Sequence, residues 1–242
     1  MLVATGPHYP PTAQQHPLQI SDTEQYSDTS MYIDQVRTPA EPATRLTRKE
    51  SQQTTRARLV ASAITLFARQ GVGATSLNAV AEHAGFSRGA VHGNYTSKDE
   101  LAAAVAATVA DELTPQLQQT LTSPLPSGER LTAYIHTFLD YCAQNPDAAG
   151  ALIAVFGHRG RVDPQHYRER AMAALGDLIA LFEEGQCHGE MRAFDTTTMA
   201  FALRTVLDNT AALLRDPGAD AGALAAEIAA LFTAATREEG PA

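Results

Sequence analysis

The sequence has no tryptophan and only two cysteines, Cys142 and Cys187. Such a low cysteine content is typical of a protein in a reducing compartment, where disulfides do not form. It contains no run of about 18 apolar residues, which excludes a transmembrane helix. The N-terminus lacks a charged region followed by an apolar one, so no secretory signal peptide is expected. These absences predict a protein that works in the cytoplasm and does not bind a membrane.

Signatures of enzymes are absent as well. The sequence has no HExxH or CxxC metal motif, no glycine-rich phosphate loop after a strand and no G-x-S-x-G nucleophile motif. We therefore expect no enzymatic activity, no cofactor and no bound metal. Two weaker alternatives remain open: a metal site formed by His158, Asp163 and His166, and a redox role for Cys187 beside His188.

The segment from residue 76 to 101 has the spacing of a helix-turn-helix. Ala81 is small enough to let two helices approach closely, and Gly85, four positions later, can adopt the left-handed conformation that ends the first helix. Val91, six positions further on, is placed to pack the second helix against the first. A helix-turn-helix inserts its second helix into the major groove of DNA, so this spacing predicts DNA binding.

A helix is predicted upstream of this motif. Apolar residues recur at helical spacing from residue 54 to 70. Thr54 or Thr55 is the predicted N-cap of this helix, and Gly71 follows it as a stop signal.

Downstream of the motif, Ser97 and Glu100 form an S-x-x-E capping box at the start of another helix. Lys98 falls in the first turn of that helix, where the helix dipole disfavours a cation. A DNA phosphate bound at this helix end would offset the conflict, and simple solvation of Lys98 is the alternative.

A resemblance to the N-terminal DNA-binding domain of the TetR family of bacterial transcriptional regulators covers about residues 52 to 113. It is carried by the R-x-x-L-V-x-x-A helix that ends in L-F-x-x-x-G, the G-A-T-S-L start of the next helix, the A-x-x-x-G turn and the S-K-x-E-L box. The resemblance implies an all-α homodimer in which three N-terminal helices bind DNA. A larger C-terminal helical domain would bind a small molecule and dimerise.

DNA contacts are expected in and around the second helix of the motif. Bases are expected to face Arg88, Gly89, Ala90 and His92, with Arg88 as the reader of guanine through its paired donors. Phosphates are expected to be held by Thr75, Ser76, Ser87, Asn94 and Lys98. The family commonly has tyrosine at the position of His92, histidine at that of Asn94 and phenylalanine at that of Tyr95, so a relative's operator sequence does not transfer to this chain.

The net charge of −9 is unevenly distributed along the chain. Residues 45 to 98 carry eight basic and two acidic side chains, a net charge of +6, whereas residues 1 to 44 carry −4 and residues 99 to 242 carry −11. Positive charge is therefore concentrated on the motif, where DNA phosphates would need to be neutralised.

Three segments are predicted. Residues 1 to 44 hold six prolines and show no helical or strand period, which indicates a disordered N-terminal arm. Residues 45 to 96 form the helix-turn-helix domain, and residues 97 to 242 form the C-terminal helical domain. Helices of the latter are expected at 97–113, 129–144, 146–156, 164–186, 195–215 and 221–237, with Pro115 as a break or kink and residues 157–164 as a loop.

The C-terminal domain is expected to bind a ligand and a second copy of the chain. A mostly apolar pocket would be lined by Tyr134, Phe138, Phe156, Tyr167, Met172, Phe182 and Asn209, with plain core packing as the alternative for the apolar members and a dimer contact as the alternative for Asn209. The last two helices are apolar on more than one face, which predicts a four-helix dimer interface through Leu203, Leu207, Leu214, Leu224, Ile228 and Leu231.

Together these features predict a dimeric DNA-binding transcriptional regulator, a repressor that binds a palindromic operator and is released by a small, largely apolar effector. Its partners would be double-stranded DNA, the effector and a second copy of the chain. The rival hypothesis is a helical enzyme or ligand-storage protein with a vestigial helix-turn-helix, and operator binding separates the two.

Overall fold

The computed structural model describes residues 47–162, 165, 172, 175–216 and 218–238. Within them every regular element is a helix, and one isolated antiparallel bridge joins Met191 to Arg237. The all-α fold class is therefore confirmed. The arm predicted for residues 1 to 44 lies outside the described residues. None of the described helices is long and apolar enough to span a membrane.

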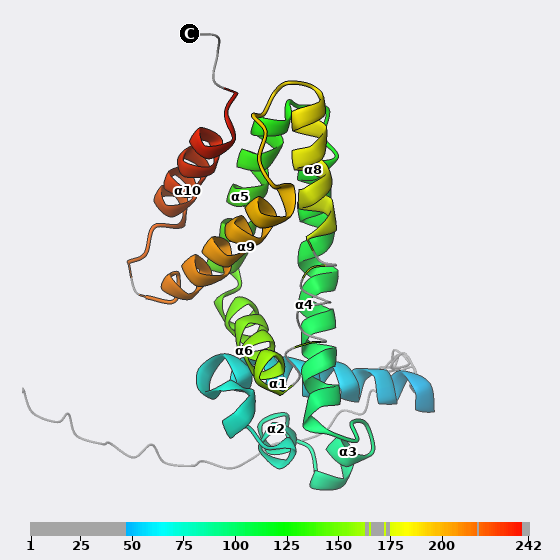
Figure 1. The fold of residues 1–242 in the computed structure, drawn as a ribbon. Helices are drawn as coiled ribbons and strands as arrows, with labels where there is room; N and C mark the ends of the chain where they lie inside the picture. The colour runs from blue at the N-terminus through cyan, green and yellow to red at the C-terminus, as the bar shows by residue number, and fades with distance from the viewer. Residues whose placement is uncertain (1–46, 163–164, 166–171, 173–174, 217, 239–242) are drawn as a thin grey trace, which may run out of the picture. The chain divides into compact units, whose positions relative to one another are not determined.

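The first three helices form the predicted helix-turn-helix domain (Figure 1). They are α1 (Arg48–Ala74), α2 (Leu77–His83) and α3 (Arg88–His92). Helix α2 starts at Ser76, whose hydroxyl oxygen accepts a hydrogen bond from the backbone N–H of Ala79 at 3.1 Å. Gly85 follows the helix with a φ of +73°, so its predicted left-handed conformation is confirmed.

Helix α1 begins earlier than the sequence pattern indicated. Thr47 accepts a hydrogen bond from the backbone of Glu50 at 3.3 Å, and the Glu50 carboxylate accepts one from the Thr47 N–H at 2.7 Å. This capping box satisfies two N–H groups that the helix leaves free and so fixes its start. Thr54 and Thr55 are not the cap, because both lie inside the helix and donate their hydroxyls to backbone carbonyls one turn earlier.

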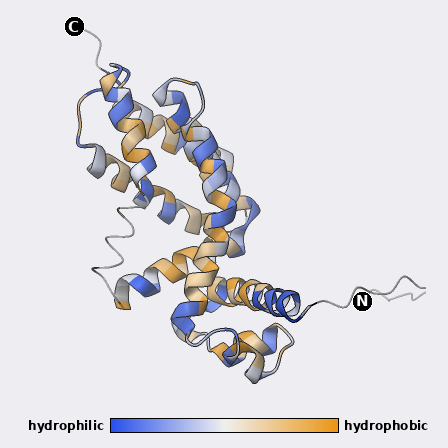
Figure 2. Cartoon of the chain, turned by 90° about the vertical axis from the view of Figure 1, so that its right-hand side faces the viewer, coloured by the Kyte–Doolittle hydropathy of each residue, from blue (hydrophilic) through white to orange (hydrophobic). Residues whose placement is uncertain are grey.

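The first turns of α1 are hydrophilic and exposed, and its buried residues begin at Leu59 (Figure 2). Gly71, the predicted stop, interrupts the regular helix near its end with a φ of +78°, and the helix continues past it to Ala74. The buried face of α1 therefore runs from Leu59 to Val72, and the polar turns that precede Leu59 project from it.

Six further helices follow in the described part of the chain: α4 (Lys98–Leu121), α5 (Ser127–Gln144), α6 (Pro146–Val162), α8 (Gly176–Cys187), α9 (Thr196–Leu213) and α10 (Ala221–Thr236). The predicted break at Pro115 is wrong, since α4 passes through it. Leu113 and Leu117 are buried on either side of the proline, and this packing outweighs the local cost of a missing N–H. The predicted loop is also wrong for residues 157–162, which continue α6.

Two predicted helix starts are confirmed. The Ser97 hydroxyl accepts a hydrogen bond from the Glu100 N–H at 3.1 Å and caps α4. The Glu100 carboxylate completes the cap through Thr96 rather than Ser97, at 2.7 Å from both the N–H and the hydroxyl of Thr96. Asp195 caps α9 by accepting from the backbone of Thr198 at 2.7 Å. Both caps fix a helix entry through short-range contacts that sequence spacing reveals.

Two hydrophobic cores meet at α6. The first core joins α1, α2, α3 and the start of α4, and the second joins the end of α4 to α5, α8, α9 and α10. Ala151 and Val155 of α6 are buried in the first core, whereas Ala149 and Leu152 are buried in the second. One helix therefore supports the helix-turn-helix domain with one side and the C-terminal domain with another.

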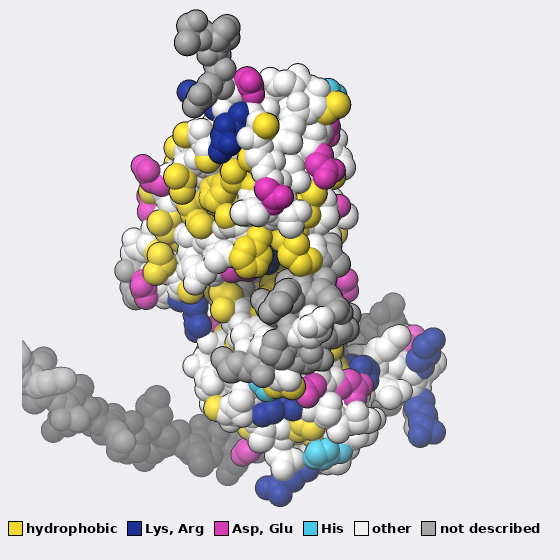
Figure 3. Space-filling view, in the orientation of Figure 1, with side chains coloured by type: hydrophobic (Ala, Val, Ile, Leu, Met, Phe, Trp, Pro, Cys, Tyr) yellow, Lys and Arg dark blue, Asp and Glu magenta, His cyan; other side chains and the backbone are white. Residues whose placement is uncertain are grey.

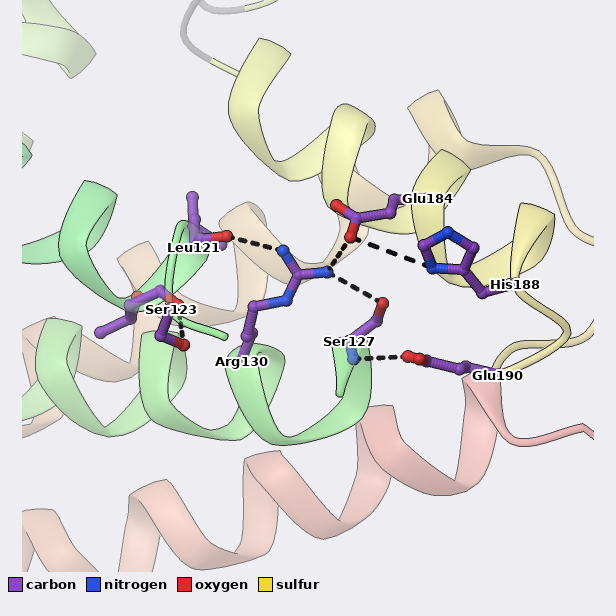
Figure 4. Close-up of polar contacts among 8 residues, drawn as sticks. Leu121, Ser123, Ser127, Arg130, Glu184, His188 and Glu190 are labelled. Atoms are coloured by element: carbon purple, nitrogen blue, oxygen red, sulfur yellow. Dashed lines mark hydrogen bonds and ion pairs between the residues drawn. The ribbon is translucent and has the colours of Figure 1, made fainter. Parts of the chain in front are cut away.

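A buried arginine fastens the end of α4 to α5 and α8 (Figure 4). Arg130 is 7% exposed and donates to the carbonyl of Leu121 at 2.9 Å and to the hydroxyl of Ser127 at 3.1 Å. It also forms a 2.7 Å ion pair with Glu184, and the hydrogen bond from Arg130 lowers the pKa of the Glu184 carboxyl. A buried charge requires such partners, so this cluster fixes how the three helices meet.

Candidate nucleic-acid interface and ligand cavity

The recognition segment, residues 87 to 92, presents small and polar side chains to solvent. Val91 is fully buried, so the opposite side of α3 faces outward. The exposed residues are Ser87, Arg88, Gly89 and His92, and Ala90 is half-buried. In the described part of the chain, no protein group holds the side chains of Arg88 or His92. This arrangement leaves a guanidinium and an imidazole free for a partner, and Gly89 allows close backbone approach.

Two of the predicted phosphate contacts turn inward instead. Thr75 is 1% exposed, and its hydroxyl donates to the carbonyl of Gly71 at 2.8 Å and accepts from Gln70 at 3.1 Å. The Asn94 amide donates to the carbonyl of Ala90 at 2.8 Å, and its oxygen is buried without a hydrogen-bond partner among the described residues. Because these side chains serve the ends of α1 and α3, Thr75 and Asn94 do not fit the role predicted for them.

Ser76, Ser87 and Lys98 lie where a phosphate could reach them. Ser76 and Ser87 are exposed caps of α2 and α3, and the Ser87 hydroxyl makes no capping hydrogen bond. The Lys98 ammonium donates to the carbonyl of Gly73 at 2.8 Å. It is therefore not simply solvated, but a lysine ammonium carries further N–H donors that a phosphate can use.

An apolar cavity lies between α4, α5, α6 and α9. Its volume is about 10 Å³, room for roughly one water molecule, so it is nearly closed in this structure. Phe138 and Phe156, both predicted as ligand residues, line it. The remaining lining residues were not predicted: Leu113, Tyr141, Cys142, Ala149, Leu152, Ile153, Asp208 and Ala211.

The other apolar residues predicted for the pocket do not line this cavity. Tyr134 and Phe182 are buried in the second core, where Phe182 packs edge-to-face on Phe194 with ring centroids 5.5 Å apart. Met172 is partly buried against the same core. Tyr167 lies outside the described residues. The core-packing alternative therefore applies to Tyr134 and Phe182.

Polar groups stand at the edge of the cavity. The Asp208 carboxylate accepts from the Arg204 guanidinium at 2.9 Å, and Arg204 lies over the ring of Phe138 at 4.9 Å from its centroid. Tyr141, which also lines the cavity, donates to Glu112 of α4 at 3.1 Å, and burial followed by this hydrogen bond raises the pKa of Tyr141. These groups could orient a polar end of a ligand whose body is apolar.

Helices α9 and α10 expose an apolar surface. Phe201 and Leu213 of α9 are 55% and 53% exposed, and Leu231 of α10 is 59% exposed. Figure 3 shows hydrophobic side chains gathered over these two helices. Thr205 and Asn209 are exposed at four-residue intervals between Phe201 and Leu213, and the Asn209 amide donates to the Thr205 carbonyl at 2.7 Å. Asn209 therefore belongs to this stripe and not to the cavity.

Most of the residues predicted for a dimer interface face the core of the chain and not its surface. Leu203 and Leu207 are 0% exposed, and Ile228 is 8% exposed, because they build the second core of the chain itself. Leu214 and Leu224 are half-buried. Of the six predicted residues Leu231 alone is largely exposed, so the available surface is that of Phe201, Leu213 and Leu231.

The predicted alternatives of a metal or redox site gain no support. His158 lies on α6 rather than in a loop and pairs with Asp99 at the start of α4 at 3.0 Å. Asp163 and His166 lie outside the described residues, and within the described ones no three His, Cys, Asp or Glu side chains gather as a metal site would need. Cys187 is exposed at the end of α8.

Comparison with known proteins gives a family for the DNA-binding part and a fold for most of the chain. Residues 59–105 match the family model of bacterial regulatory proteins of the tetR family. No curated protein matches the chain significantly.

Solved structures share the fold at low sequence identity. A tetR-family regulatory protein from Rhodococcus RHA1 is 21% identical, with a TM-score of 0.66 over 76% of this chain and 98% of that one. The ketosteroid transcriptional regulator KstR2 of Mycobacterium tuberculosis is 17% identical, with a TM-score of 0.63 over 76% and 95%. The fatty acid degradation regulator FadR of Bacillus halodurans is 15% identical, with a TM-score of 0.66 over 76% and 97%.

The matched residues contain the whole of α2 and α3, with the exposed recognition segment and the turn at Gly85. The fold shared with the solved regulators extends beyond them into the C-terminal helices. The DNA-binding part of the chain therefore matches the tetR family of bacterial regulatory proteins, and most of the chain shares the fold of solved tetR-family regulators.

Proposed function

We propose that this protein represses transcription by binding a palindromic operator as a homodimer, and that a small, largely apolar effector releases it. The observation that carries this function is the exposed recognition segment, where Arg88 and His92 have no partner in the described chain. The apolar surface of Phe201, Leu213 and Leu231 supports a dimer. Such a regulator works in the cytoplasm and needs no catalytic activity.

The effector is expected to act through α6. Pockets for small ligands usually measure about 300–1,000 Å³, far more than the closed cavity, so its walls must move apart on binding. Leu152 and Phe156 of α6 line the cavity, while Ala151 and Val155 of the same helix are buried against the helix-turn-helix domain. A displacement of α6 would therefore change the position of the recognition segment. Helix α4 also has buried residues in both cores and offers a second route for such a displacement.

The chemistry of the effector is suggested by the cavity wall. Two regulators that share the fold are a ketosteroid transcriptional regulator and a fatty acid degradation regulator. Steroids and fatty acids are apolar molecules with few polar groups. Phe138, Leu152 and Phe156 would suit the apolar body of such a molecule, and Asp208 with Arg204 could contact a polar end.

A gel shift on the gene's own upstream DNA tests this function. The protein should retard that DNA and not a scrambled duplex of equal length. Decanoate and androstenedione serve as largely apolar probes, with glucose as the hydrophilic control. Release by an apolar probe and not by glucose is the expected result. A protein that retards neither duplex, or is released only by glucose, would contradict the proposal.

Lys98→Ala should weaken binding to every DNA sequence alike. A phosphate contact contributes through counterion release, so its loss should reduce the slope of log affinity against log salt by about 0.9 for each protomer. Fluorescence anisotropy over a salt series on operator and random duplexes measures this slope. Because Lys98 also donates to Gly73 at 2.8 Å, the melting temperature has to be measured in parallel. An unchanged slope would remove Lys98 from the phosphate contacts.

A further inference from the structure

The recognition helix α3 is too short to hold its own position. It spans Arg88–His92, only five residues, and an isolated helix of this length is unstable in water. It packs chiefly against α2, and side chains of α1 contact the residues on either side of it. These flanking contacts are where α1 can influence the orientation of the recognition segment.

Two arginines of α1 make these contacts. Arg58 donates to the carbonyl of Ala84 at 3.0 Å, and its guanidinium lies over the ring of Phe86 at 4.6 Å from the centroid. These atoms belong to the turn that precedes α3. Phe86 is half-buried, so the stack is partly shielded from water.

Arg56 makes the same pair of contacts on the far side of α3. It donates to the carbonyl of Asn94, and its guanidinium lies over the ring of Tyr95 at 4.3 Å from the centroid. Tyr95 is 1% exposed and belongs to the first core. Each end of the recognition segment is thus held by one guanidinium that both stacks on a ring and donates to a carbonyl.

We propose that Arg56 and Arg58 are positioning residues that set the orientation of α3 on DNA and do not themselves neutralise phosphates. Both lie outside residues 59–105, the part matched by the family model. Their charges count toward the basic N-terminal domain, yet each guanidinium is held twice, by a backbone carbonyl and by an aromatic ring, whereas among the described residues Lys98 is held by one carbonyl alone. A planar guanidinium can stack and donate at once, whereas a lysine ammonium of equal charge cannot reproduce that geometry.

The test rests on the proposed DNA-binding function. It asks whether operator affinity depends on the charge of the two arginine side chains or on the planar geometry of their guanidiniums. Arg56→Lys and Arg58→Lys keep the charge and remove the planar fork. Operator affinity should fall roughly 3- to 30-fold for each, as expected for the loss of a partly buried cation–π contact. Affinity for a random duplex of equal length, and the salt slope on both duplexes, should stay as in the wild type. The operator duplex is one selected by the wild-type protein from a randomised library.

Two matched variants separate this role from simple loss of folding. Arg69→Lys changes an exposed arginine of the same helix and should leave operator affinity unchanged. Phe86→Leu leaves Arg58 and its charge in place but removes the ring, and should lower operator affinity with an unchanged salt slope. Circular dichroism confirms that each variant is helical. If a lysine variant unfolds, Phe86→Leu and Tyr95→Leu carry the same test.

Lysine variants that bind the operator as tightly as the wild type would overturn the proposal. Replacing Arg56 or Arg58 by alanine should leave the salt slope unchanged. A slope lowered by about 0.9 per protomer, the signature of a phosphate contact, would also overturn the proposal. A wild-type protein that selects no duplex would instead contradict the proposed function itself. The two failures are therefore distinguishable.

Discussion

Leu231→Glu should produce a folded monomer that no longer binds the operator. Leu231 is 59% exposed on α10, so a glutamate there is tolerated by the single chain. In a dimer the same carboxylate would be buried without a partner, which is costly. A monomer can occupy only one half-site, so specific affinity should fall about 10³-fold or more, to the level of non-specific binding. Sedimentation velocity and a gel shift measure both effects.

Leu207→Glu is the matched control for this experiment. Leu207 is 0% exposed and belongs to the second core, so the glutamate should unfold the chain rather than separate two chains. Circular dichroism distinguishes an unfolded chain from a folded monomer. A Leu231→Glu protein that still sediments as a dimer would show that α10 does not form the interface.

Arg88→Ala should remove sequence specificity while leaving the fold intact. Arg88 is exposed in the first turn of α3, and no group of the described chain holds its side chain. If it donates to O6 and N7 of a guanine, its loss costs about 1–3 kcal/mol per half-site on the operator. Binding to random DNA should change much less.

Anisotropy titrations of the Arg88→Ala protein on operator and random duplexes, together with the melting temperature, measure this difference. An equal loss on both duplexes would mean that Arg88 contacts only the phosphate backbone. Arg69→Ala, which removes an exposed arginine outside the recognition segment, is the charge control.

Features that depend on neighbouring residues were predictable from the sequence. The left-handed Gly85, the N-cap Ser97 and the N-cap Asp195 are each decided within a few positions, and all three are present. The start of α1 was missed although Thr47 and Glu50 carry a T-x-x-E capping signal, because the apolar period that marks a helix begins only at Leu59.

Features that depend on tertiary packing were not predictable. Helix α9 is apolar on two sides, and only the folded chain shows that Leu203 and Leu207 face its own core while Phe201 and Leu213 face outward. Residues 157–162 were predicted as a loop, but they continue α6 past Phe156, its last residue packed against a core. Sequence periodicity gives the number of apolar faces of a helix and not the neighbour that each face meets.

The inward position of Asn94 also depends on tertiary packing and was not predictable from the sequence. Sequence alone placed it in a DNA-facing stretch, yet its amide caps α3 and its carbonyl accepts from Arg56 of α1, 38 residues away in the chain. A contact of that separation has no local signature. The residues that we propose to face DNA are therefore Ser76, Ser87, Arg88, His92 and Lys98, and Gly89 and Ala90 would leave room for the DNA.

Sedimentation equilibrium of the protein on its selected operator duplex, combined with a footprint of the same complex, tests the central claim most directly. The account predicts two protomers on each duplex and a two-fold symmetric footprint whose half-sites lie about one helical turn, ~34–36 Å, apart. A single protomer on a site without two-fold symmetry, or a protein that binds no duplex above the level of random DNA, would contradict it.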